Sequence, residues 1–208
     1  VLTATSPARL SGTLQASPQP TEVAQAPAPA APAPPTPSAV PPTRPVPAPP
    51  APPPTAVAAL VVGDSITLGC ADALHAELGA GTLVDGKVGR QFSTAAAIVA
   101  AWTGTHPGPV VVDLGANGTV QPGDVESVVA AAGLRRVVLV GVSVPRRWRD
   151  GNNAVLSAAA AAHAPEVVFV DWAAIVAAHP GALGPDQVHP TIPGRTLLAN
   201  AVAGALRS

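Results

Sequence analysis

Residues 58–66 read AALVVGDSI, and this stretch sets the fold that we expect for the chain. It begins with a short, continuous apolar run, which is typical of a β-strand buried on both faces in a parallel sheet. The run ends at Gly63-Asp64, so Ser65 stands at the turn between the strand and a following helix. A serine at such a turn can point its hydroxyl into a cleft. The alternative is a serine that only caps the helix N-terminus.

Short β-branched runs alternate with alanine-rich stretches from here to the end of the chain. We expect strands at residues 58–62, 83–84, 110–114, 136–142 and 166–170. We expect helices at residues 71–78, 94–102, 125–132, 153–163 and 193–206. Strands that alternate with helices through right-handed crossovers build a parallel sheet covered on both faces. The pattern therefore predicts a three-layer α/β/α domain with a five-stranded, flavodoxin-like parallel sheet, whose functional residues gather beyond the carboxyl ends of the strands.

The first 55 residues have a different composition, because they hold 18 of the 27 prolines, no aromatic residue and almost no charge. Such a segment offers little to a hydrophobic core and favours an extended polyproline II backbone. We therefore predict a disordered Pro/Ala-rich linker over residues 1–55 and one globular, monomeric domain over residues 56–208. The linker is either a tether or a low-complexity tail without a function.

Composition also excludes several classes of function. The formal net charge is −1 and no basic stripe is present, which argues against a nucleic-acid partner. The histidines outside the C-terminal motif show no metal-ligand spacing, so we expect neither a metal nor a cofactor. Cys70 is the only cysteine, and we interpret it as a buried thiol rather than a reactive one. The chain has no methionine, which indicates a fragment or a processed product with a missing upstream segment.

A serine attacks an ester at neutral pH only when a neighbouring base removes its proton. Residues 184–190 read GPDQVHP and supply such a base in His189, three positions after Asp186. The Asp186 carboxylate can accept the Nδ1 proton of the imidazole, which leaves Nε2 free to deprotonate Ser65. Taken alone, His189 is also consistent with a surface or core histidine that has no catalytic role.

Acyl transfer also needs hydrogen-bond donors aimed at the negative oxygen of the tetrahedral intermediate. The candidates are the N–H groups of Ser65 and Gly89 and the side-chain amide of Asn117. Taken singly, Gly89 is also consistent with a turn glycine and Asn117-Gly118 with a tight turn. The four segments occur in one order, each next to a predicted strand or the last helix, which favours an enzyme that forms a Ser65 acyl-enzyme.

Gly63-Asp64-Ser65, Gly89, Gly115-Ala116-Asn117 and the Asp186 to His189 segment resemble the four sequence blocks of the SGNH/GDSL hydrolase family. Residues 88–91, 114–118, 144–148, 153 and 170–172 more narrowly resemble the extracytoplasmic SGNH domain of acyltransferase-3 proteins, which include peptidoglycan O-acetyltransferases. This resemblance implies that Ser65 receives an acetyl group and passes it to a hydroxyl of a cell-wall glycan. It also implies an extracytoplasmic domain, tethered to an upstream membrane acyltransferase domain that presents the acetyl donor.

Four further residues are candidates for substrate binding. Arg90 and Gln91 belong to the segment that carries the narrower resemblance, and Arg146 and Trp148 offer a cation and an aromatic face that suit a carbohydrate. The alternative for Arg146 and Trp148 is a solvated loop with one packed indole. Three readings of the whole domain stay open: an acetyltransferase, a secreted carbohydrate acetylesterase with the same residues, and a non-enzymatic glycan-binding module.

Overall fold

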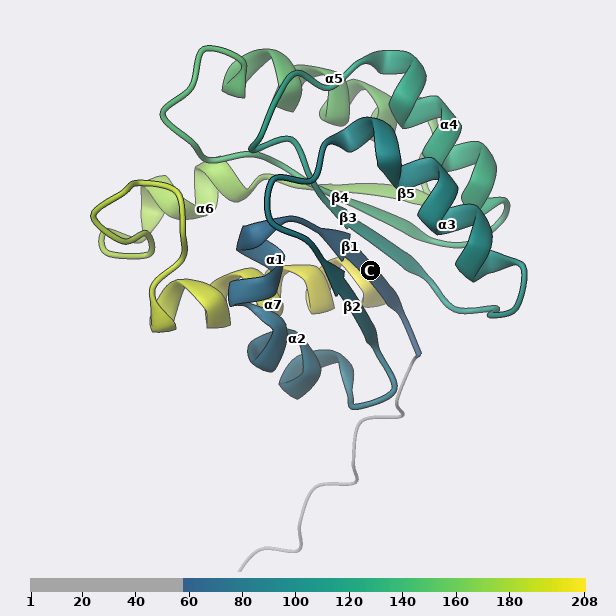
Figure 1. Cartoon of the computed structure of the whole chain (residues 1–208), viewed down its shortest axis with the longest axis horizontal. Coiled ribbons are helices and arrows are strands. Elements are labelled where there is room, and N and C mark those ends of the chain that lie inside the picture. Colours follow the sequence, from purple (N-terminus) through teal and green to yellow (C-terminus); the bar gives the residue numbers. More distant parts are fainter. Residues whose placement is uncertain (1–57) are drawn as a thin grey trace, which may run out of the picture. The chain divides into compact units, whose positions relative to one another are not determined.

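The structure is a computed structural model that describes residues 58–208, so the linker expected at residues 1–55 lies outside the described residues. The described residues form one sheet of five parallel strands in the order β2-β1-β3-β4-β5 (Figure 1). The strands are β1 (Leu60–Gly63), β2 (Leu83–Gly86), β3 (Val110–Asp113), β4 (Val137–Val140) and β5 (Val167–Val170). This order confirms the predicted flavodoxin-like sheet.

Helices cover both faces of the sheet, which confirms the three-layer prediction. They are α1 (Ser65–Gly69), α2 (Ala71–Leu78), η1 (Phe92–Thr94), α3 (Ala95–Thr103), α4 (Pro122–Ala132), α5 (Arg149–Ala162), α6 (Trp172–Ala178) and α7 (Ile192–Arg207). One core lies between the sheet and α3, α4 and α5, and the other between the sheet and α1, α2, α6 and α7 (Figure 1). None of the helices in residues 58–208 combines the length and hydrophobicity needed to cross a bilayer.

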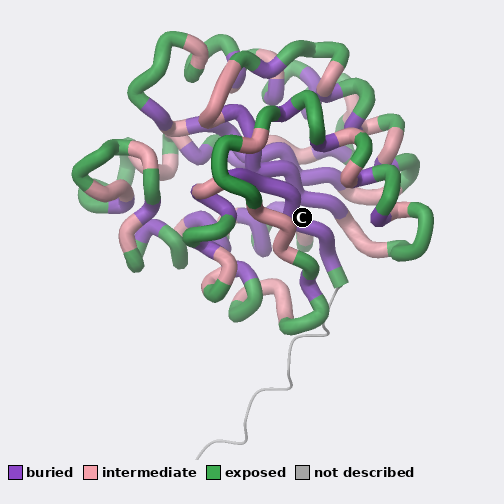
Figure 2. Tube along the Cα trace, viewed as in Figure 1, coloured by how far each residue is buried: buried purple, intermediate pink, exposed green. Residues whose placement is uncertain are grey.

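Alternation along the strands divides their side chains between the two cores. In β1, Val62 packs into the core under α3, α4 and α5, whereas Val61 packs into the core on the opposite face. All residues of β1, β3 and β4 are buried, while the edge strands β2 and β5 are partly exposed, so burial is deepest along the middle of the sheet (Figure 2). The near-continuous apolar runs in the sequence therefore correspond to central strands buried on both faces.

The structure corrects several predicted boundaries. β1 begins two residues later than expected and β4 covers only Val137–Val140, because the ends of both apolar runs continue as loops outside the ladder. Helix α5 begins at Arg149, four residues before the expected start. The predicted helix ranges include neither α1 nor α6, because their five and seven residues are too few to show a helical period.

The carboxyl edge of the sheet brings the expected site residues together. Gly63 at the end of β1 pairs with Gly86 of β2 and with Asp113 of β3, so the three strands end at one level. The loops that follow these strands carry Ser65, Gly89 and Asn117. The segment before α7 returns to the same edge, where Leu183 forms an isolated antiparallel bridge with Pro190 around the Asp186 to His189 turn.

Candidate active site

The structure brings Ser65, His189 and Asp186 together in one hydrogen-bonded chain. The Oγ of Ser65 lies 3.0 Å from Nε2 of His189, and Nδ1 of His189 lies 2.7 Å from Oδ2 of Asp186. In the tautomer that carries its proton on Nδ1, His189 donates to the carboxylate and accepts the Ser65 hydroxyl proton at Nε2. This geometry suits a general base that deprotonates a serine nucleophile.

The turn from Gly184 to His189 holds the Asp186 carboxylate in place. Its Oδ1 accepts the backbone N–H groups of Val188 and His189, each at 3.0 Å, and the Gly184 N–H donates to the His189 carbonyl at 2.8 Å. The hydrogen bond from the His189 ring, followed by the two backbone bonds, lowers the pKa of Asp186 to about 2. Asp186 therefore stays ionised at neutral pH and can stabilise the imidazolium that forms during catalysis.

The nucleophile sits in the first turn of a short helix that Asp64 caps. Oδ1 of Asp64 accepts the Ile66 N–H at 2.9 Å, so Asp64 and not Ser65 is the N-cap residue. Ser65 is the first residue of α1, and its N–H therefore has no acceptor within the helix. This N–H is available to an oxyanion, and its role as a donor stays a prediction.

Asn117 is oriented by Asp64. The Asn117 Nδ2 donates one hydrogen to Oδ2 of Asp64 at 2.7 Å, and the second hydrogen on Nδ2 stays available. Asp64 is 1% exposed, and this burial raises its pKa, while the hydrogen bonds from Ile66 and Asn117 act in the opposite direction. A carboxylate thus fixes the amide rotamer, so the sequence motif Gly-Asp-Ser supplies an orienting acid as well as the serine.

Asn152 supports the Asn117 loop and was not singled out from the sequence. It is 1% exposed, donates to the carbonyls of Gly115 and Gly118 at 2.9 and 2.8 Å, and accepts the Val120 N–H at 2.8 Å. These three hydrogen bonds tie the loop after β3 to helix α5 from both sides of Asn117. The only feature of the sequence that could have indicated this role of Asn152 is the pair of asparagines, Asn152 and Asn153, near the start of an alanine-rich helix.

Gly89 lies in the exposed loop after β2 with φ of +72°, a conformation that favours glycine. Its N–H donates no hydrogen bond within the described part of the chain. The side chain of the next residue, Arg90, is held by three hydrogen bonds. Its Nη1 donates to the Asp85 carbonyl and, at 3.1 Å, to the Gly63 carbonyl. Its Nη2 donates to Oδ1 of Asp85 at 2.7 Å. Gln91 donates to the Asn117 carbonyl at 2.9 Å. Gly89, Arg90 and Gln91 are all absent from the lining of the cavity beside Ser65, so the oxyanion role of Gly89 stays a prediction.

A cavity of about 320 Å³ opens beside the triad. Its lining consists of Ser65, Ala116, Asn117, Val144, Arg146, Trp148, Asp186, Val188 and His189. Arg146 and Trp148 are thus the two of the four expected substrate-binding residues that the structure places at the cavity. Arg146 is exposed, and its side chain forms no ion pair or hydrogen bond with any of residues 58–208, while the Trp148 Nε1 is buried without a hydrogen-bond partner there.

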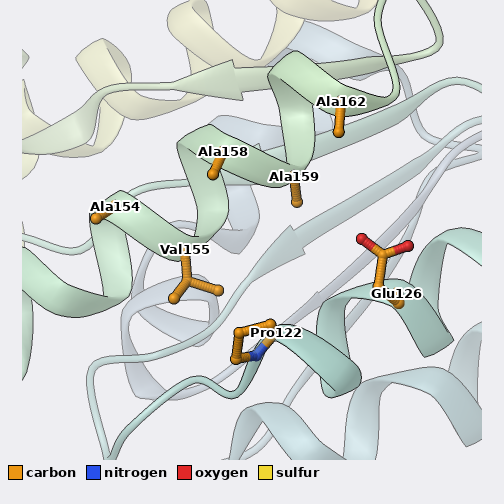
Figure 3. Close-up of a pocket in the computed structure, with 7 residues that line it drawn as sticks. All are labelled: Pro122, Glu126, Ala154, Val155, Ala158, Ala159 and Ala162. Carbon is orange, nitrogen blue, oxygen red and sulfur yellow. The ribbon is translucent and has the colours of Figure 1, made fainter.

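A larger apolar cavity, of about 410 Å³, lies between α4 and α5 (Figure 3). Four alanines, Val155 and Pro122 line it, and Glu126 is its only charged lining residue. It shares no residue with the triad, and no serine, cysteine or histidine lines it beside Glu126. The smaller cavity is therefore the candidate active site.

A second acid lies beneath the site, at the end of β3. Oδ2 of Asp113 accepts the Thr67 hydroxyl at 2.7 Å, and burial, with a smaller contribution from the charge of Asp64, raises the pKa of Asp113 to about 7. Cys70 is fully buried, and burial raises the pKa of its thiol to about 12. Residues 58–208 contain no group of three side chains suited to hold a metal ion.

Comparisons with known proteins point to one group of enzymes, although no family model matches the chain. The Bacillus subtilis protein YrhL, named provisionally as a peptidoglycan O-acetyltransferase, is 32% identical over 156 residues, which are 74% of this chain and 24% of YrhL. The Staphylococcus aureus O-acetyltransferase OatA is 27% identical over 72% of this chain and 25% of its own length. The chain thus spans about a quarter of the length of these relatives.

One of the similar solved structures is a catalytic domain. It is the C-terminal catalytic domain of peptidoglycan O-acetyltransferase A from Streptococcus pneumoniae, solved with a methylsulfonyl adduct. Its TM-score is 0.59 and its sequence identity 26%, over 73% of this chain and 93% of that domain. The matched part of the chain therefore corresponds to nearly all of that catalytic domain.

Proposed function

We propose that residues 58–208 form a domain of the SGNH type and that this domain is the catalytic part of an extracytoplasmic O-acetyltransferase. It transfers an acetyl group, through a Ser65 acyl-enzyme, to a hydroxyl of a cell-wall glycan. The single observation that carries this proposal is the Ser65–His189–Asp186 chain, with distances of 3.0 and 2.7 Å. The names of the relatives support the acetyl group and the peptidoglycan acceptor.

In the first step, Oγ of Ser65 attacks the carbonyl carbon of the acetyl donor while Nε2 of His189 takes the hydroxyl proton. The carbonyl oxygen becomes negative and faces the N–H groups of Ser65 and Gly89 and the free amide hydrogen of Asn117. When the intermediate collapses, the bond to the leaving alcohol breaks and His189 returns the proton to that alcohol. Asp186 stays ionised throughout and holds the imidazole.

In the second step, a glycan hydroxyl gives its proton to His189 and attacks the acyl carbon, which releases the Ser65 oxygen. His189 then returns the proton to Ser65. A glycan held in the cavity has a far higher local concentration than a free one, so it competes with water for the acyl-enzyme. In the complete protein, an upstream membrane acyltransferase domain presents the acetyl donor, and the Pro-rich segment tethers this monomeric domain to it.

Ser65→Ala tests the proposal. We expect its kcat on an aryl acetate to fall by at least about 10⁴-fold, because the remaining groups cannot form an acyl-enzyme. Methylsulfonyl fluoride should add to the wild type and not to the variant, as measured by mass spectrometry. Ser157→Ala, on the exposed side of α5, is the control and should behave as the wild type. Full activity of Ser65→Ala would contradict the proposal.

The second candidate is an acetylesterase that uses the same residues. His189 and Asp186 are about half exposed, at 50% and 51%, so water can reach the acyl-enzyme. Incubation with an acetyl donor and chito-oligosaccharides separates the two: acetylated sugar in the mass spectrum supports transfer, and acetate alone supports hydrolysis. A non-enzymatic glycan-binding module would bind the sugars but form no serine adduct.

A further inference from the structure

We propose that the glycan bound at Ser65 carries an anionic substituent, a carboxylate or a phosphate, and that Arg146 selects it. This inference rests on the proposed function, because it concerns the same cavity. It names a chemical class of substrate and the residue that recognises it.

The size of the cavity places the reacting group and the Arg146 contact on one small ligand. Its volume of about 320 Å³ lies near the lower end of the range for ligand sites, roughly 300 to 1,000 Å³. A space of this size accommodates about one sugar unit. Ser65 and His189 line the same cavity as Arg146, so a hydroxyl or acetyl group at Ser65 and a substituent at Arg146 belong to the same or adjacent sugar residues.

Residues 58–208 supply no anion for Arg146. Asp186 is the only carboxylate that lines the cavity, and both of its oxygens are engaged, one by the His189 ring and the other by two backbone N–H groups. By contrast, Arg90 and Arg149 each form an ion pair within residues 58–208. Arg146 therefore lines the cavity as a cation that no carboxylate of residues 58–208 neutralises, so a bound ligand can supply the counter-charge.

A guanidinium is suited to anions. It presents five N–H donors in a planar fork, accepts no hydrogen bond, and matches the two oxygens of a carboxylate or phosphate. A neutral hydroxyl can accept one of these donors but leaves the charge uncompensated. The anion adds a second hydrogen bond and an opposite charge, but Arg146 is exposed and solvent screens the pair, which predicts roughly a two- to fivefold preference for an anionic ligand.

Three mono-O-acetyl sugars with the acetyl group at the same position test this inference: a methyl glucoside, the corresponding methyl glucuronide, and the 6-phosphate of the glucoside. We expect the wild type to deacetylate at least one anionic sugar with roughly two- to fivefold higher kcat/KM than the neutral one. This preference should shrink as salt rises from low to high concentration, because salt screens an exposed charge. The anionic sugar with the higher kcat/KM identifies the substituent.

Adjacent arginines provide the control. Arg147 is exposed like Arg146 but does not line the cavity, so Arg146→Gln and Arg147→Gln remove the same charge from neighbouring positions. Arg146→Gln should abolish the preference by raising KM for the anionic sugar alone, and Arg147→Gln should keep it. Equal loss on all three sugars in Arg146→Gln would overturn the inference in favour of a role in the oxyanion site or in folding. Equal loss of the preference in both variants would also overturn the inference, because it would show that the preference comes from the general positive charge of this surface.

Binding to Ser65→Ala gives the same information without turnover. Calorimetric titration with the three sugars should show tighter binding of an anionic one, and equal affinities, or tighter binding of the neutral sugar, would overturn the inference. Such a result would leave the proposed function intact as long as wild-type hydrolysis of an aryl acetate is lost in Ser65→Ala. Conversely, an active Ser65→Ala protein would remove the proposed function and show that the cavity is not the reaction site.

Discussion

Arg90→Lys decides whether Arg90 binds substrate, as the family resemblance implies, or anchors the loop that carries Gly89. The Arg90 side chain is 8% exposed and makes three hydrogen bonds, to the Gly63 carbonyl, the Asp85 carbonyl and the Asp85 carboxylate. It thereby joins the ends of β1 and β2 next to Ser65 and Gly89. Lysine keeps the charge, but its single nitrogen cannot reproduce the planar fork that meets all three acceptors.

The size of the effect follows from these bonds. A hydrogen bond from a charged donor contributes about 1.5–3 kcal/mol, and the half-open Asp85 ion pair contributes less because solvent screens it. We expect Arg90→Lys to lower the free energy of unfolding by about 2 kcal/mol, which is a Tm decrease of roughly 4–8 °C for a domain of this size. Loss of one oxyanion donor costs about 10² to 10³ in kcat, so a displaced Gly89 should cost roughly 10- to 100-fold.

Steady-state kinetics on an aryl acetate and thermal melts measure both effects. Because Arg90 does not line the cavity, KM should stay within about twofold while kcat falls. Arg136→Lys is the control. Arg136 also donates to a carbonyl, that of Ala205 at 2.8 Å, but it lies just before the amino end of β4, away from the carboxyl ends of the strands where Ser65 lies. It should lose stability and keep its kcat. A higher KM with unchanged kcat in Arg90→Lys would refute anchoring and support substrate binding.

Two further substitutions test the oxyanion donor and the buried acid. Asn117→Ala should lower kcat on an aryl acetate by about 10² to 10³-fold and change KM little, because we expect the amide to act mainly in the transition state. A change in KM alone would contradict this role. Burial raises the pKa of Asp113 from 3.8 to about 7, so the folded protein keeps a proton that the unfolded chain loses, and stability falls as pH rises from about 4 to 7. Asp113→Asn removes this pH dependence, while its amide oxygen can still accept the Thr67 hydroxyl. In thermal melts, the Tm of the variant minus that of the wild type should therefore increase as the pH rises between 5 and 8. Parallel Tm curves would show that Asp113 is ionised throughout.

The sequence was sufficient to predict the sheet and the proximity of Ser65, His189 and Asp186, because both leave periodic or ordered signals. Continuous apolar runs mark β1, β3 and β4, and the position of Ser65 after the first run already places it at the carboxyl edge. The 3.0 Å contact between Ser65 and His189 joins residues 124 positions apart, and only the order of the motifs pointed to it.

The sequence could not indicate the roles of Arg90 and Asn152, because these roles depend on tertiary contacts. Arg90 looks like any arginine in a loop until the structure shows its guanidinium turned toward Gly63 and Asp85. Asn152 stands in an alanine-rich helix, and its support of the Asn117 loop arises only because α5 packs beside the end of β3. Side chains that stabilise backbone carbonyls have no fixed spacing from the residues they hold, so no local pattern reveals them.

The two halves of the site differ in burial, and this difference assigns them different tasks. Asp64 and Asn152 are each 1% exposed and fix Asn117 through hydrogen bonds that no ligand is needed to complete, so the oxyanion donor is oriented before a substrate arrives. His189 and Asp186, by contrast, are about half exposed. In the proposed mechanism, stabilisation of the oxyanion is therefore the same whichever nucleophile resolves the acyl-enzyme. The choice between a glycan hydroxyl and water must be made on the open side, where Arg146 and Trp148 line the cavity and a bound glycan can displace water from His189.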